Sequence, residues 1–72
     1  MAEELRVAIA EGLQTLPLRH RSALELSSLG YGSDEIAEML HVRPDNVRVV
    51  LFRARKAMAI FLNARFSGGV AP

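Results

Sequence analysis

Basic and apolar side chains are interleaved on one side of a stretch near the C-terminus of the chain. Seven residues between positions 48 and 60 make up this side: Arg48, Val49, Phe52, Arg53, Arg55, Lys56 and Ile60. No acidic residue occurs after Asp45. Cations bind phosphate oxygens, and apolar side chains between them suit thymine methyl groups or sugar edges in a groove. The pattern therefore indicates a DNA-binding surface.

A single long helix over residues 44–65 would hold these side chains on one side. Pro44 suits the first helical position, because its missing N–H would have no partner there, and Asp45 complements the positive end of the helix dipole. Six apolar residues recur on the other side at three- and four-residue spacing: Val47, Leu51, Ala54, Met58, Phe61 and Leu62. We expect this apolar side to be buried, with Val50 at its edge.

Three shorter helices are predicted upstream, over residues 3–15, 18–29 and 34–40. Pro17 ends the first, since a residue before proline avoids the helical region. Gly30 can end the second with a positive φ, and Ser33 is a suitable N-cap for the third. The residues expected inward are Leu5, Ile9, Gly12, Leu13 and Leu16, then Ala23, Leu24, Leu26 and Ser27, then Ile36, Ala37 and Leu40.

The third and fourth predicted helices are joined by only three residues, His41-Val42-Arg43. Two helices with so short a turn form a helix-turn-helix. A basic run such as residues 53–56 is usually a solvated face when it stands alone. Its place on the second helix of this motif favours DNA binding instead. We therefore predict an all-α fold, a small four-helix domain with a C-terminal helix-turn-helix and a long recognition helix.

Charge is distributed unevenly along the 72 residues. Residues 1–45 hold four basic and eight acidic side chains, a net charge of −4, whereas residues 46–72 hold five basic and no acidic ones. A basic segment attached to an acidic remainder indicates a polyanionic partner on one side. The chain has no cysteine and no apolar run long enough to span a bilayer. We expect a cytoplasmic protein with no membrane partner.

Catalytic and metal sites are not predicted. His20 and His41 are the only histidines, and neither has an acidic cluster beside it that would complete a metal site. Ser22, Ser27 and Ser28 lie with His20 on one short helix, in a domain too small to enclose a typical substrate pocket. We therefore expect no enzyme activity, no catalytic residue, no metal and no cofactor.

Several segments together resemble region four of bacterial sigma factors, most closely the extracytoplasmic-function group. They are LPLRHR at 16–21, LGY at 29–31, EIAEML at 35–40, NVR at 46–48 and LFRARKAM at 51–58. The similarity covers residues 13–62 without a gap. It implies a domain that recognises the promoter −35 element in the major groove, contacts the flap of the RNA polymerase β subunit and is often masked by an anti-sigma factor.

The chain departs from the family pattern at three positions. His41 stands where the family usually has glycine, Arg43 where it often has a serine N-cap, and Val50 where it often has arginine. The residues expected at the DNA base edges or groove are Arg48, Val49, Phe52 and Arg53. Those expected at DNA phosphates are Arg19, Arg21, Arg43 and Lys56.

Two alternatives stay open. One is a free-standing helix-turn-helix regulator, which would normally dimerise, whereas a sigma domain is expected to be a monomer. The other is a sigma-like protein-interaction module that binds an anti-sigma factor or polymerase without reading DNA, which Val49, Val50, Phe52 and Ile60 would favour. In each case we expect residues 1–66 to form the domain and residues 67–72 a flexible tail.

Overall fold

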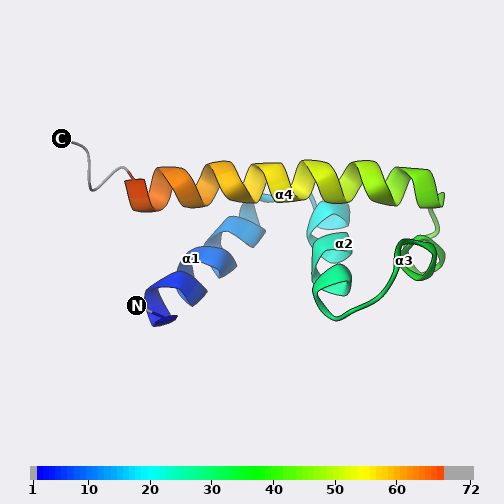
Figure 1. Ribbon diagram of the computed structural model, residues 1–72, viewed down its shortest axis with the longest axis horizontal. Helices are drawn as coiled ribbons and strands as arrows, with labels where there is room; N and C mark the ends of the chain where they lie inside the picture. The colour runs from blue at the N-terminus through cyan, green and yellow to red at the C-terminus, as the bar shows by residue number, and fades with distance from the viewer. Residues whose placement is uncertain (1, 68–72) are drawn as a thin grey trace.

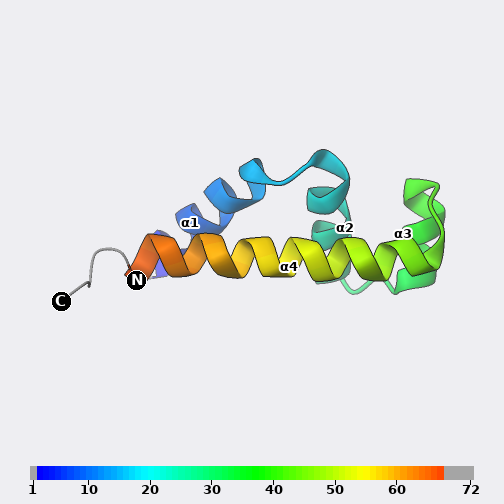
Figure 2. The same ribbon diagram turned by 90° about the horizontal axis from the view of Figure 1, so that it is seen from above.

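The computed structural model describes residues 2–67, which form four α-helices (Figure 1). These are α1 (Ala2–Thr15), α2 (Leu18–Ser28), α3 (Ser33–Leu40) and α4 (Pro44–Ser67). The 24 residues of α4 give it a length of about 36 Å. The other three helices lie along one side of it, with α1 beside its C-terminal half and α3 beside its N-terminal end (Figures 1 and 2). The all-α four-helix prediction is confirmed.

The predicted tail, residues 67–72, overlaps α4 by one residue, because the helix extends to Ser67. The rest of that prediction, residues 68–72, lies outside the described residues. Within residues 2–67 no helix is long and apolar enough to cross a bilayer.

Two left-handed residues end the middle helices. Gly30 has φ 101°, and the N–H groups of Gly30 and Tyr31 donate to the carbonyls of Ser27 and Leu26 at 3.0 and 3.2 Å. This pair of bonds is a Schellman motif, which satisfies carbonyls at the end of α2. The predicted cap of α3 was wrong: Gly32, not Ser33, is the N-cap. Its N–H donates to Glu35 Oε1 at 2.8 Å, so the carboxylate of Glu35 satisfies the N–H of the cap residue.

His41 forms the turn of the helix-turn-helix in the left-handed region, with φ 59° and ψ 44°. The N–H of Val42 donates to the carbonyl of Ala37 at 3.0 Å, in the bonding pattern that closes α2. The carbonyl of Arg43 accepts the N–H groups of Asn46 and Val47 at the start of α4. A guanidinium has no acceptor, so the Arg43 side chain cannot cap these donors.

Two apolar clusters share the buried face of α4. The first joins α2, α3 and the N-terminal half of α4 through Ala23, Ile36, Ala37, Val47 and Leu51. The second joins the end of α1 to the middle of α4 through Leu16, Ala54 and Met58. The predicted buried face of the long helix is confirmed for its first four members, while Phe61 and Leu62 are half-buried.

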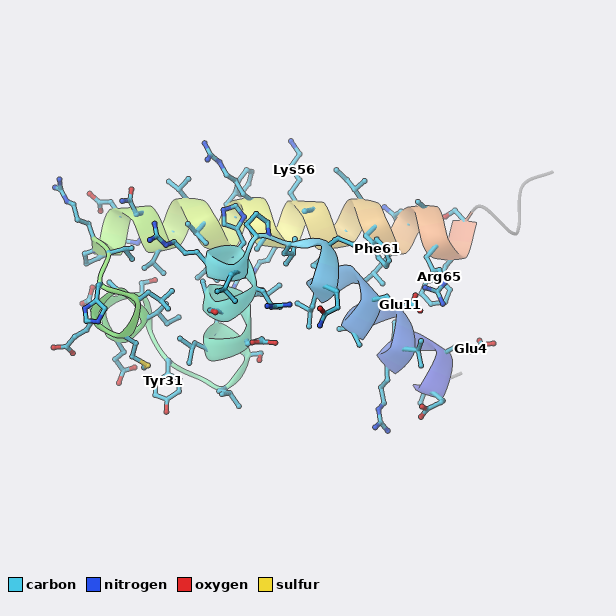
Figure 3. The ribbon with its side chains drawn as sticks, turned by 180° about the vertical axis from the view of Figure 1, so that it is seen from behind. Glu4, Glu11, Tyr31, Lys56, Phe61 and Arg65 are labelled. Carbon is cyan, nitrogen blue, oxygen red and sulfur yellow. The ribbon has the colours of Figure 1, made fainter. Side chains whose placement is uncertain are left out.

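The buried face of α1 differs from the prediction. Gly12 is buried as predicted, and Ala8, which the prediction left out, is buried as well, whereas Leu5 and Ile9 are 43% and 37% exposed. A Cβ at Gly12 would lie 2.9 Å from atoms of Met58 and Phe61, so the two helices approach closely only because this residue has no side chain. Towards its N-terminus α1 diverges from α4 (Figure 1). Leu5, in this part of α1, is therefore exposed to solvent. Arg65 of α4 pairs with Glu11 of α1 across this region (Figure 3).

Candidate nucleic-acid interface

The side of α4 opposite the other three helices is uncovered. Figure 3 shows Lys56 extending from it, away from the rest of the domain. We define the outer face of α4 by six exposed residues: Asp45, Arg48, Val49, Phe52, Arg53 and Lys56. Their spacing follows the helical repeat, half a turn out of phase with the buried Val47, Leu51, Ala54 and Met58. The residues expected at the base edges or groove therefore share one surface.

Apolar side chains in the middle of this face are exposed to solvent. Phe52 is 66% exposed and has exposed Val49 three residues before it. Neighbours at this spacing meet on a helix surface, so the two form a patch flanked by cations. A scattered apolar residue on a surface needs no explanation, but such a patch is typical of a binding site.

The cations of the outer face are available to an external anion. Arg48 lies 3.8 Å from Asp45, with the two side chains 71% and 81% exposed, so this surface pair stabilises the fold little. No salt bridge found within residues 2–67 involves Arg53 or Lys56. The positive charge of these two residues, which lie within one turn of the helix, is therefore available to an external anion.

The other phosphate candidates lie in the turn before α4 and in α2. Arg43 is exposed in the turn that leads into α4, and Arg19 is exposed in the first turn of α2, the end of that helix nearer α4 (Figure 1). Arg21 is half-buried and donates to Gln14 Oε1 at 3.2 Å. Arg21 must therefore give up or share this bond to bind another partner, whereas Arg19 and Arg43 are exposed.

Arg55 does not belong to the outer face, although the sequence prediction grouped it with the other cations. Its guanidinium donates to the Ser27 hydroxyl of α2 at 3.1 Å. At 100° per residue Arg55 lies between the two sides of the helix, and the position of α2 decides which way it turns.

Arg55 also lines an apolar groove of about 440 Å³ between α1, α2 and α4. The remaining lining residues are Ile9, Leu13, Leu24, Glu25, Ser28, Met58, Ala59 and Leu62. The sequence prediction missed this groove, because it counted the large apolar side chains of its lining towards the core, namely Ile9, Leu13, Leu24, Met58 and Leu62. The exposed Ile9 is the signal that α1 carries more apolar surface than α4 covers.

The histidines lie on separate elements, His20 half-buried in α2 and His41 exposed in the turn before α4. Among residues 2–67 no group of three histidine, cysteine or acidic residues is placed to hold a metal ion.

Comparison with known families gives one match. The family model described as "Sigma-70, region 4" matches residues 6–58. This span contains the whole outer face, the helix-turn-helix and every phosphate candidate. No curated protein and no solved structure matches the chain.

Proposed function

The chain belongs to the sigma-70 region 4 family, and we propose that it recognises a promoter −35 element as part of RNA polymerase holoenzyme in transcription initiation. The family is one of DNA-binding helix-turn-helix domains of sigma factors, without enzymatic chemistry. The observation that carries the proposal is the outer face of α4, where exposed cations surround Val49 and Phe52 on the second helix of the motif. We assign the domain to the extracytoplasmic-function group because of the segments quoted above.

The dimensions of the motif suit a major groove. The groove is about 12 Å wide and admits one α-helix of about 10–12 Å diameter. With the first turns of α4 in the groove, Arg48 and Arg53 would meet base edges, and Val49 and Phe52 would meet thymine methyl groups. Phosphate contacts would fall to Arg19, Arg21, Arg43 and Lys56, which fix register without reading sequence.

Val50 contributes to the core rather than to this surface. It is half-buried and packs against the cluster that contains Ile36, Ala37 and Val47. Where the family often has an arginine, this chain therefore has an apolar residue that packs against the core. Without an arginine at position 50, discrimination between bases would depend mainly on Arg48 and Arg53.

We further propose that the apolar groove binds a helix of the polymerase core, the β flap. Apolar grooves accept the apolar face of an amphipathic helix. The groove is lined by α1 and α2, which lie on the other side of α4 from its outer face (Figure 1). DNA and polymerase could thus bind at the same time, and an anti-sigma factor would act by covering either surface. The domain would act in the cytoplasm as a monomer within holoenzyme.

The competing function is a protein-interaction module without DNA readout. The exposure of Phe52 and Val49 favours it, because a protein partner could cover the same patch. The cations around the patch argue for DNA, since a protein interface of this kind usually has few charges at its centre.

Paired variants test the two surfaces separately. Phe52→Glu should abolish binding of the 72-residue chain to a −35-type duplex, measured by fluorescence anisotropy, and should leave capture of purified polymerase core intact. Ile9→Glu changes an exposed groove residue on α1. This variant should lose capture of the polymerase core and should keep its binding to the duplex. Loss of polymerase capture with Phe52→Glu, while duplex binding persists, would support the interaction module instead.

A further inference from the structure

A cleft lies where α1 diverges from the C-terminal end of α4, at the other end of the molecule from the helix-turn-helix (Figure 1). Its volume is about 360 Å³, and its lining residues are Glu3, Glu4, Val7, Arg65 and Phe66. Val7 and Phe66 are 41% and 39% exposed, so the fold leaves much of both side chains in solvent. The cleft therefore offers an apolar surface beside two carboxylates.

The net charge of this cleft is negative. Its lining cation, Arg65, pairs with Glu11 of α1, so it does not compensate the two carboxylates of the lining. Glu3 lies 3.7 Å from Arg6, with both side chains exposed. No salt bridge found within residues 2–67 involves Glu4. An occupant that is complementary to the cleft would carry positive charge together with an exposed apolar side chain.

The outer face of α4 has this chemistry, since its apolar patch is flanked by cations. The outer face of one copy and the cleft of another are complementary, whereas two outer faces or two clefts would repel each other. We propose that a second copy of the chain occupies the cleft. Phe52 of that copy would contact Val7 and Phe66, and its Lys56 would lie beside Glu4.

The two surfaces of a single copy cannot meet. Phe52 and Phe66 lie on one continuous helix, which holds them about 21 Å apart along its axis. Lys56 and Glu4 lie on opposite sides of α4 (Figure 3). The contact therefore forms between different copies, and it is heterologous, because the surface that a copy inserts differs from the surface that it offers.

This contact covers the face assigned above to DNA. Resting on the proposed function, free copies at high concentration mask one another's outer faces. A duplex separates them, because its phosphates compete for the same cations. The association should be weak, since a cleft with five lining residues buries much less than the roughly 1,200 Å² of a stable interface.

Two complementary variants of the full chain test the contact by NMR. Phe52→Glu disables the outer face and keeps the cleft, whereas Glu4→Lys disables the cleft and keeps the outer face. The unaltered chain should show chemical shifts that change with concentration, and neither variant alone should do so. When unlabelled Glu4→Lys is added to isotope-labelled Phe52→Glu, the amide signals of Val7 and Phe66 should shift. Raising the salt concentration should reverse these shifts, because salt screens the charges.

Glu38→Lys is the matched control, since Glu38 is an exposed acid on α3 outside the cleft. This control should self-associate like the unaltered chain, whereas Glu4→Lys should raise the Kd of self-association at least about tenfold. If circular dichroism shows that Glu4→Lys disturbs α1, Glu4→Gln removes the charge, keeps the side-chain shape and decides in its place.

Three results would overturn the proposal. The first is an unaltered chain whose shifts do not change up to millimolar concentration, and the second is self-association that persists in both variants. The third is a cleft that responds to purified polymerase core and not to a second copy. Self-association that a duplex does not disturb, in a chain that binds no duplex, would instead overturn the proposed function and leave this contact standing.

Discussion

His41 shows how a single residue sets the angle of the helix-turn-helix. It is the one non-glycine residue with positive φ among residues 2–67. For an L-residue this conformation costs about 1–2 kcal/mol, although histidine tolerates it better than most. The Schellman bonds at the end of α3 require a left-handed residue at this position. Packing of the two helices that His41 joins keeps it in this conformation.

We predict that His41→Gly raises the free energy of unfolding by roughly 0.5–1 kcal/mol. The gain is the strain removed, less the entropy of about 0.5–1 kcal/mol that glycine adds to the unfolded chain. Urea denaturation followed by circular dichroism measures it. Gly30→Ala is the matched control and should lower stability, because Gly30 has φ 101°. A destabilised His41→Gly would mean that the imidazole makes a contact worth more than the strain.

At the residue scale, the sequence predicted exposure well where helical phase alone decides it. Arg48, Val49, Phe52, Arg53 and Lys56 all lie on the exposed side, as the 3.6-residue period requires. Arg55 lies between the two sides, and its bond to Ser27 depends on where α2 packs, which no local pattern contains. The role of each exposed residue toward DNA stays a prediction.

At the element scale, the contact between α1 and α4 depends on small residues. Ala8 and Gly12 face α4, and Met58 and Phe61 occupy the space where a Gly12 side chain would stand. The sequence prediction placed Leu5 and Ile9 on the same inward face as Gly12 and left Ala8 out. Periodicity measures which side is apolar, but the distance between two helices is set by side-chain volume at the contact. The groove beside α1 could not be predicted for the same reason.

Gly12→Leu should therefore lower the free energy of unfolding by about 1–3 kcal/mol, the usual cost of overpacking. Urea denaturation would measure the loss. Ala10→Leu, at an exposed position of the same helix, controls for the change of residue type and should alter stability by less than about 0.5 kcal/mol. Equal effects of the two substitutions would show that the close approach at Gly12 contributes nothing.

At the scale of the whole molecule, net charge differs between α4, which is basic, and the other three helices together, which are acidic. Residues 46–72 carry five basic and no acidic side chains, and three of these cations lie on the outer face of α4. The acidic residues belong almost entirely to the three helices on the other side. Such a dipole orients the domain as it approaches a polyanion, with α4 leading.

This arrangement predicts a steep dependence of duplex binding on salt. If four to six cations meet phosphates, log affinity should fall against log salt concentration with a slope of about −4 to −5. Binding by the isolated domain should also be weak, because a sigma domain normally acts while tethered to polymerase. A titration of one labelled duplex at several salt concentrations gives the slope. An affinity independent of salt would exclude phosphate contact as its source.

The central claim, that the outer face of α4 reads DNA sequence, is tested most directly by two variants on two duplexes. Arg53→Ala should weaken binding to the cognate duplex by about 1–3 kcal/mol and leave a scrambled duplex almost unaffected, if Arg53 pairs with guanine. Lys56→Ala should weaken both duplexes alike and flatten the salt slope by about one. Anisotropy titrations at two salt concentrations provide all these values. If neither substitution changes binding to either duplex, the outer face does not read DNA and the protein-interaction function replaces it.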